Sequence, residues 1–395
     1  MAMEKKYLIV NRGSASEKYA IYTKEKCLGF WHLERAEYVG TLYFDNQKEV
    51  KTLTKKEFEH SLQYALSGFV MKGIIINQKE IAGVGIRIVA PGKHFQDDKI
   101  IDKAYEKEIK KMVHDAPLHL LPTYEMIKTL KKTFKNIPIV GVSDSDFHDT
   151  IPDKAKYYGL PFEDSQKFNI QKYGYHGISV ESVLNKLQKE SGVLPSRLII
   201  CHIGSGVSVT AIKDGKCVEN SMGFTPLEGV MMATRAGDID PGVLAFLTDN
   251  LGLKGKKLKE YLNKRCGLLG VSGKSSDVRD LIKLEKEGNS QAKLALDMYA
   301  YHLQKYIGSY FVVLGGLDTL IFTATVGERS FVMREKICSG LESLGVKLDK
   351  IKNDNSESID VDISAVDSKV KILVRKTDEM GQIAKDTMQV LESLL

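Results

Sequence analysis

The chain has 395 residues, of which 43% are apolar and 27% charged, as in globular proteins long enough to build two hydrophobic cores. The net charge of +6 is mild and no basic block is interleaved with aromatic residues, so we expect no nucleic-acid partner. The 5 cysteines are scattered without a CxxC pair, which argues against a disulfide framework or a zinc site. Neither a signal peptide nor a membrane-spanning run is evident, so we expect a cytoplasmic protein without membrane association.

The first predicted element is a β-hairpin. The run Leu8-Ile9-Val10-Asn11-Arg12-Gly13-Ser14 leads into a second β-prone stretch, which predicts a strand, a tight turn and a returning strand. The same pattern recurs at an offset of 191 residues (8 to 199), in Ile199-Ile200-Cys201-His202-Ile203-Gly204-Ser205. This repeat indicates two duplicated domains. Because glycine lets phosphate oxygens approach backbone N–H groups, each turn is a candidate phosphate site.

The rest of the chain alternates between predicted strands and helices. Short apolar runs predict strands over residues 83–89, 137–142 and 317–326. Helical spacing of apolar residues predicts helices over 103–113, 123–134, 179–190, 289–313 and 382–394. This alternation is typical of the α/β class. We expect an N-terminal domain over 1–148 that takes back a C-terminal helix at 381–395, and a second domain over 149–380.

Polar residues follow the predicted strands repeatedly. Asn11, Arg87 and Asp144 each come at the end of an apolar run, where ligands bind in α/β folds. Taken singly, Arg87 is explained by a surface ion pair and Asp144 by a helix cap. Together with Arg235 and His176 they are suited to phosphoryl transfer, whose transition state spreads negative charge over the transferring group. Magnesium, which prefers oxygen ligands, fits the same set.

At these residues the sequence resembles the acetokinase (acetate kinase) family, of the actin, sugar-kinase and Hsp70-like superfold. The segment Ser221–Pro241 carries most of the resemblance, which extends from residue 7 to about residue 387. It implies two duplicated ribonuclease-H-like (actin-like ATPase) domains with an interdomain active-site cleft. It also implies a homodimer that binds a small-molecule carboxylate and a nucleotide. The reaction it implies is a reversible, direct in-line phosphoryl transfer between ATP and acetate, giving acetyl phosphate and ADP with Mg²⁺ or Mn²⁺.

The resemblance assigns a role to each matching residue. The catalytic residues it implies are Asp144, Arg87, Arg235, His176 and His119. The substrate pocket it implies comprises Val89, Leu118, Tyr175 and Pro226, and the metal ligands are Asn11 and Glu379. The nucleotide- and phosphate-binding residues it implies are Ser14, Ser16, Lys18, His202, Gly204, Ser205, Gly206, Asp277, Val278, Arg279, Thr325, Val326 and Gly327. Since an acceptor carboxylate is already ionised, we expect Asp144 to organise the site rather than to act as a general base.

Several positions depart from the family pattern. Tyr175 stands where the family has phenylalanine, which places a hydroxyl beside the apolar pocket. Thr325 replaces a glycine of the adenine slot, and Arg329 adds bulk and charge nearby. Three alternatives therefore stay open: pyrophosphate as donor, a longer or hydroxyl-bearing acceptor such as propionate or butyrate, and a non-catalytic nucleotide-binding member of the superfold. The joint presence of two arginines and a histidine favours an enzyme.

Overall fold

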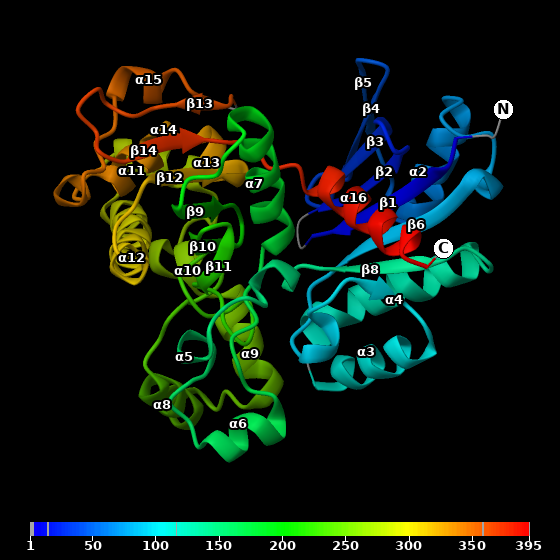
Figure 1. The fold of residues 1–395 in the computed structure, drawn as a ribbon. Helices are drawn as coiled ribbons and strands as arrows, with labels where there is room; N and C mark the ends of the chain where they lie inside the picture. The colour runs from blue at the N-terminus through cyan, green and yellow to red at the C-terminus, as the bar shows by residue number, and fades with distance from the viewer. Residues whose placement is uncertain (1–3, 14–15, 116, 358, 395) are drawn as a thin grey trace. The chain divides into compact units, whose positions relative to one another are not determined.

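The computed structural model describes residues 4–13, 16–115, 117–357 and 359–394, and the side chains of residues 114–119 lie outside this description. The chain forms two compact units, Met1–Asp146 with Asp378–Leu395, and Phe147–Thr377. Each unit holds one mixed sheet with helices packed on it (Figure 1). The predicted α/β class is confirmed.

The first unit is built on an 8-stranded sheet in the order β5-β4-β3-β2-β1-β6-β8-β7. Its strands are β1 (Lys6–Arg12), β2 (Ser16–Tyr22), β3 (Cys27–Glu34), β4 (Val39–Phe44), β5 (Gln47–Thr52), β6 (Ile81–Ile88), β7 (Lys99–Ile100) and β8 (Ile139–Ser143). β1 to β5 form an antiparallel meander, while β1, β6 and β8 run parallel. The carboxyl ends of these three parallel strands therefore meet at one edge of the sheet.

Helices cover both faces of this sheet. The main helices are α1 (Lys55–Glu59), α2 (Ser61–Met71), α3 (Lys103–Asp115), α4 (Pro117–Thr133) and the C-terminal α16 (Glu379–Glu392). α16 packs across β1, β6 and β8, and α2 packs on β2 and β3 (Figure 1). A Cβ atom on Gly85 would lie 1.9 Å from Thr387 Oγ1, so β6 needs glycine where α16 crosses it.

Alternation along β1 sorts its side chains between the two faces. Ile9 lies beside Gly85 on the face that α16 covers. Because side chains alternate along a strand, Asn11 shares the α16 face, whereas Arg12 lies on the opposite face. Asn11 and Arg12 are adjacent in the sequence, and their side chains thus lie on opposite faces of the sheet.

The second unit repeats the same core. Its 6-stranded sheet has the order β11-β10-β9-β12-β14-β13. The strands are β9 (Arg197–Ile203), β10 (Val207–Lys213), β11 (Lys216–Asn220), β12 (Thr319–Thr323), β13 (Val361–Asp362) and β14 (Lys371–Val374). The run β11-β10-β9-β12-β14 has the same connectivity and directions as β3-β2-β1-β6-β8, which confirms the predicted duplication.

The helices of the second unit are α5 (Asp153–Lys156), α6 (Phe162–Phe168), α7 (Gly177–Ser191), α8 (Pro241–Leu251), α9 (Gly255–Lys264), α10 (Gly267–Ser272), α11 (Val278–Lys286), α12 (Ser290–Leu314), α13 (Ala324–Arg329), α14 (Phe331–Cys338) and α15 (Lys350–Asp354). Of these, α7, α12 and α13 pack on the second sheet. Val180 and Val183 of α7 pack with Leu198 and Ile200 of β9 in one buried cluster. His202 follows at the next position of that face, so the sheet presents it to α7. No described helix is long and apolar enough to cross a membrane.

Two predicted element boundaries were wrong. The predicted strand over 317–326 ends at Thr323, where α13 begins. Ala324 has a φ of 65°, in the left-handed region, and this change of backbone direction leaves no mark in the apolar pattern. The predicted helix over 123–134 starts earlier, since α4 begins at Pro117 and holds Pro122 inside it.

Candidate functional site

Four predicted site residues meet at the strand ends of the first unit. The guanidinium of Arg87, at the end of β6, donates to both carboxylate oxygens of Asp144, at 3.0 and 2.8 Å. Arg87 Nη1 lies 3.4 Å from Asn11 Oδ1 and 3.9 Å from Glu379 Oε2. Asn11 Nδ2 in turn donates to Glu379 Oε2 at 2.7 Å. We call these four residues the strand-end cluster.

The strand-end cluster is buried and carries a net negative charge. Asp144 is 1% exposed, and the side chains of Arg87 and Glu379 are nearly buried. Burial alone would lower the pKa of Arg87, but the nearby carboxylates of Asp144 and Glu379 outweigh burial and raise it. One guanidinium therefore faces two acidic side chains, so the cluster attracts a cation more readily than it attracts a free polyphosphate.

Three further predicted residues of this unit, Ser16, Lys18 and Val89, lie on or next to strands of the same sheet. Lys18 pairs directly with Asn11 across the β1–β2 hairpin, so the two side chains share the α16 face. Gly13 N donates to Ser16 O at 2.8 Å and closes the hairpin turn. Val89 is half-buried directly after β6. Ser14 and the side chains of Leu118 and His119 lie outside the described residues.

Two predicted histidines stack in the second unit. The rings of His176 and His202 lie with centroids 3.9 Å apart and an interplanar angle of 20°. His176 Nδ1 lies 3.0 Å from Ser208 Oγ, and His202 Nδ1 lies 2.8 Å from Ser179 Oγ. When Ser208 donates to Nδ1, the neutral ring of His176 carries its proton on Nε2 and can donate from there. Neither serine was predicted as a site residue, because the hydroxyl–imidazole pairing depends on how α7 and β10 pack.

The second hairpin turn lies against these groups. A Cβ atom on Gly206 would lie 3.2 Å from His176 Nε2 and 3.5 Å from Arg235 Nη1. Gly204 N donates to Gly206 O at 3.0 Å, just as Gly13 closes the first turn. Glycine at 206 thus lets the turn backbone approach both an imidazole and a guanidinium, and Ser205 is exposed at its tip.

Arg235 is held by the backbone near the predicted acceptor pocket. Its Nη1 donates to the carbonyl of Pro226 at 3.1 Å. Tyr175 is 1% exposed, and its hydroxyl donates to the carbonyl of Phe224 at 2.9 Å. The Tyr175 hydroxyl therefore has its own acceptor in the protein. His148 Nε2 lies 3.0 Å from the carbonyl oxygen of Tyr175.

The predicted nucleotide residues divide into two places. Thr325, Val326 and Gly327 lie on α13, whose first residue, Ala324, approaches within 3.8 Å of a Cβ atom built on Gly204. The second hairpin turn therefore lies close to α13 at Gly204 and close to His176 at Gly206. Thr325 is exposed and Gly327 is buried.

The other nucleotide candidates surround the start of α11. Asp277 caps this helix by accepting from Arg279 N at 2.8 Å, and its carboxylate forms an ion pair with the same arginine. Val278 is 5% exposed and belongs to the hydrophobic core. Asp277 and Arg279 are accessible to a ligand, whereas Val278 acts through packing.

The strand-end cluster contains oxygen atoms of the kind that bind a divalent cation. Asn11, Asp144 and Glu379 offer carboxylate and amide oxygens, which magnesium prefers. Among the described residues no group of three or more His, Cys, Asp or Glu side chains is arranged to hold a metal alone. Magnesium commonly binds through one or two carboxylates with waters and substrate phosphates, so the residues fit a nucleotide-bound magnesium.

Comparisons with known proteins agree over nearly the whole chain. The profile of the Acetokinase family matches residues 6–385. An acetate kinase of Desulfitobacterium hafniense (strain DSM 10664 / DCB-2) is 39% identical over 397 residues, covering 98% of this chain and 99% of its own. An acetate kinase of Clostridium botulinum (strain Okra / Type B1) is 40% identical over 395 residues, covering 98% of this chain and 99% of its own.

Solved structures give the same result. The crystal structure of Porphyromonas gingivalis acetate kinase has a TM-score of 0.85 and 36% identity, with 98% of this chain and 100% of that chain covered. The crystal structure of a propionate kinase from Francisella tularensis has a TM-score of 0.87 and 33% identity, with the same coverage. The chain belongs to the acetokinase family.

Proposed function

We propose that this protein is a magnesium-dependent phosphotransferase that moves a phosphoryl group reversibly between ATP and acetate or another short-chain carboxylate. The observation that carries the proposal is the strand-end cluster, in which a guanidinium is fixed between Asp144 and Glu379 beside Asn11. Membership of the acetokinase family supports the same reaction. We propose that residues of both units take part in the reaction.

The residues divide the work of the transfer between them. Arg87 and Arg235 hold the acceptor carboxylate and the phosphoryl group by charge-assisted hydrogen bonds. His176 donates from Nε2 to the transferring phosphoryl group, and His202 and His119 line the phosphate path. Asp144 fixes the fork of Arg87 through two hydrogen bonds and so positions the guanidinium. In-line attack by an ionised carboxylate needs no general base, so catalysis rests on positioning and on stabilising charge.

Magnesium completes the charge balance in this proposal. Asn11 and Glu379 would hold it together with phosphate oxygens of the nucleotide, and Mn²⁺ meets the same oxygen ligands. When bound, it neutralises charge on the phosphates. The net negative charge of the strand-end cluster supports this, because a polyphosphate would otherwise approach an acidic surface.

The acceptor site favours a small apolar tail. Val89, Leu118, Tyr175 and Pro226 form the proposed pocket for the substrate methyl group. The hydroxyl of Tyr175 donates to the carbonyl of Phe224, so its proton is already used within the protein. This supports acetate or propionate over a hydroxyl-bearing acceptor, and the propionate kinase among the structural relatives makes propionate the second acceptor to test.

The proposed nucleotide path runs along the second hairpin turn. Phosphates would contact Gly204, Ser205 and Gly206, and Ser14, Ser16 and Lys18 in and after the first turn are further candidates for phosphate contacts. The adenosine would lie over Thr325 to Gly327 and near Asp277 and Arg279. Thr325 is exposed on α13, where its branched side chain would narrow the proposed adenine slot. Pyrophosphate, which needs no slot, is the alternative donor.

Hydroxylamine trapping of acyl phosphate tests the proposal directly. Acetate, propionate and butyrate are each incubated with Mg²⁺ and either ATP or pyrophosphate. We expect acyl phosphate from acetate with ATP. Turnover with pyrophosphate alone would keep the fold and the acceptor chemistry but change the donor. No product with any pair, from protein that is folded by circular dichroism, would favour a non-catalytic nucleotide-binding role.

We also propose that the enzyme is a cytoplasmic homodimer. Helix α8 buries none of its residues although it is rich in apolar side chains, and Phe246 is 64% exposed on it. Phe162 and Phe168 expose similar apolar surface at the ends of α6. A second copy would cover such surface at a small cost in polar desolvation. Light scattering should give twice the chain mass, and Phe246→Asp should lower it.

All cysteines are free thiols, in keeping with a reducing compartment.

A further inference from the structure

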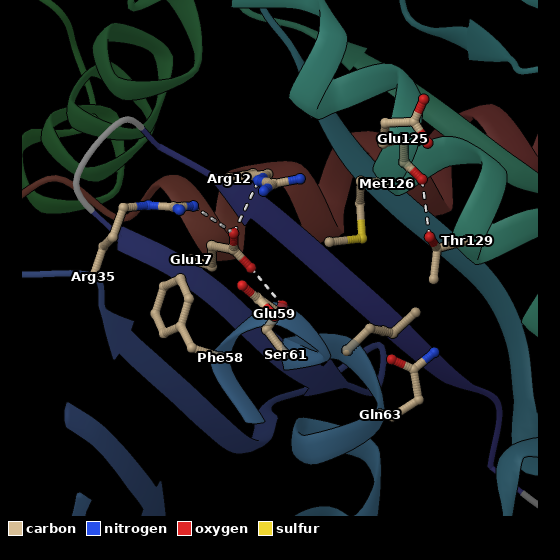
Figure 2. Close-up of a pocket in the computed structure, with 11 residues that line it drawn as sticks. Arg12, Glu17, Arg35, Phe58, Glu59, Ser61, Gln63, Glu125, Met126 and Thr129 are labelled. Carbon is tan, nitrogen blue, oxygen red and sulfur yellow. Dashed lines mark hydrogen bonds and ion pairs between the residues drawn. The ribbon is translucent and has the colours of Figure 1, made fainter. Parts of the chain in front are cut away.

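A pocket of about 250 Å³ lies on the first unit (Figure 2). Arg12 from β1, Glu17 from β2 and Arg35 just after β3 form one wall. Residues of α1, α2 and α4 form the other walls: Phe58, Glu59, Ser61, Leu62, Gln63, Glu125, Met126 and Thr129. None of these lining residues has a role in the proposed acetokinase reaction.

The pocket opens on the opposite face of the sheet from the proposed active site. Arg12 and Glu17 pair directly across the β1–β2 hairpin, so their side chains share one face. Asn11 and Lys18, one position away on each strand, point to the other face. The sheet therefore separates the pocket from the strand-end cluster, while the chain connects them through one peptide bond.

Glu17 organises the basic wall. This carboxylate is 2% exposed and lies 2.9 Å from Arg12 Nε and 3.1 Å from Arg35 Nη2. Its other oxygen accepts from Ser61 Oγ at 2.5 Å (Figure 2). The same oxygen accepts from Tyr19 OH at 2.9 Å. Two guanidiniums are thus fixed by one buried acid whose acceptor capacity is filled.

The basic wall of the pocket favours an anion. Among the residues that the structure describes, Glu17 is the one carboxylate shared by Arg12 and Arg35, which leaves one positive charge in excess on this wall. Glu59 and Glu125 add negative charge to the far wall, where Glu125 pairs with Lys128 at 2.8 Å and Glu59 with Lys55 at 4.0 Å.

The two guanidiniums are also held in place away from Glu17. Arg12 Nη1 donates to the carbonyl of Pro122 at 2.8 Å. Arg35 stacks over the ring of Phe58, 4.9 Å from its centroid. The two guanidiniums are therefore preorganised, and Gln63 adds an amide to the lining, whereas the hydroxyls of Ser61 and Thr129 already donate to Glu17 and to the carbonyl of Glu125.

We propose that this pocket binds a small oxyanion, of the size of inorganic phosphate, through Arg12 and Arg35. A planar guanidinium fork matches phosphate and carboxylate oxygens. Arg12 is the last residue of β1 and directly precedes Gly13 of the first hairpin turn. An anion bound to Arg12 would restrain this end of β1, so anion binding at the pocket would be coupled to the proposed active site.

A titration with inorganic phosphate tests this site without any need for turnover. The chain's 1 tryptophan, Trp31, pairs with Tyr19 across β2 and β3, on the pocket side of the sheet. Its fluorescence, followed in parallel with calorimetry, reports binding at the pocket. The Arg87→Ala variant serves as background, because it removes an oxyanion ligand from the strand-end cluster. Acetate titrations show whether the site prefers phosphate or carboxylate.

Three variants in this background separate the possible outcomes. Arg35→Ala, whose side chain is 47% exposed and so tolerates truncation, should weaken phosphate binding about tenfold or more. Glu17→Gln should strengthen it, because a competing negative charge is lost. Lys48→Ala, which removes an exposed charge elsewhere in this unit, should leave it unchanged. An unchanged Trp31 signal on adding phosphate, or equal weakening by Arg35→Ala and Lys48→Ala, would overturn the proposal.

Discussion

Arg235 tests the proposed chemistry at the scale of a single residue. It is half-buried, and its Nη1 donates to the backbone carbonyl of Pro226. In the proposed reaction it stabilises charge that develops on the transferring phosphoryl group.

We predict that Arg235→Ala lowers turnover by about a hundredfold to a thousandfold while the melting temperature stays near that of the wild type. Steady-state rates and a thermal melt on the same preparation give both quantities. The matched control is Arg279→Ala, which removes an exposed arginine at the adenosine side and should change the apparent affinity for ATP more than kcat. Turnover of Arg235→Ala close to that of the wild type would remove its assigned role.

His148 sets a pH limit on stability. It is 1% exposed, Nδ1 lies 3.1 Å from Cys217 Sγ, and burial lowers its pKa from 6.5 to about 4, against a smaller opposing effect of the Tyr175 carbonyl. Above pH 6.5 the ring is neutral in both folded and unfolded chains. As the pH falls from about 6.5 towards 4, only the unfolded chain gains a proton here, so stability is lost.

The loss should amount to about 3 kcal/mol by pH 4, from about 1.4 kcal/mol for each unit of pKa difference. We predict that His148→Gln is less stable at pH 7 but loses less stability between pH 6.5 and 4 than the wild type does. Urea unfolding at several pH values measures this difference. Parallel curves for the two proteins would show that His148 titrates as freely in the folded chain as in the unfolded one.

At the scale of elements, α16 joins the C-terminus to the site. It carries Glu379 at its first residue and packs over the glycines of β6. A Cβ atom on Gly83 would lie 2.3 Å from Leu391 Cδ1, and one on Gly85 lies closer still to Thr387. The position of a proposed metal ligand therefore depends on two residues without side chains.

We predict that Gly85→Val displaces α16 and lowers stability by about 1–3 kcal/mol, as overpacking does. The apparent affinity for magnesium should weaken as well, because Glu379 moves with the helix. Gly308→Ala in α12 is the control, since a Cβ atom there meets nothing within 4 Å and should be neutral or stabilising. A Gly85→Val protein with wild-type melting temperature and magnesium dependence would contradict this account of α16.

The elements also show what the sequence could and could not predict. The repeat of the two hairpins predicted the duplicated core, because Gly13 and Gly204 mark equivalent turns. The rule that ligands gather at strand ends predicted that Asn11, Arg87 and Asp144 lie together. Both arguments depend on local pattern alone.

The rest depends on packing between distant segments. β3, which supplies Arg35 to the pocket wall, was not predicted, since strand propensity changes with the neighbours of a strand. The pairing of Arg12 with Glu17 follows from hairpin register, and the serines that hold His176 and His202 follow from helix packing. Such contacts become visible only in three dimensions.

At the scale of the whole molecule, each unit contributes one part of the proposed chemistry. The first holds an acidic cluster suited to magnesium and the acceptor, and the second holds Arg235, His176 and a glycine-lined turn suited to phosphates. Neither of these two sets of residues provides both the acidic cluster and the turn suited to phosphates. The central claim is that the two sets serve a single phosphoryl transfer to a carboxylate.

The reverse reaction tests this claim most directly. The initial rate of ATP formation from acetyl phosphate and ADP is measured with Mg²⁺ for the wild type, for Arg87→Ala from the first unit and for Arg235→Ala from the second. We predict rapid ATP formation by the wild type and a severe loss in each variant. ATP formation that survives removal of either arginine, or its absence from folded wild-type protein, would contradict the account.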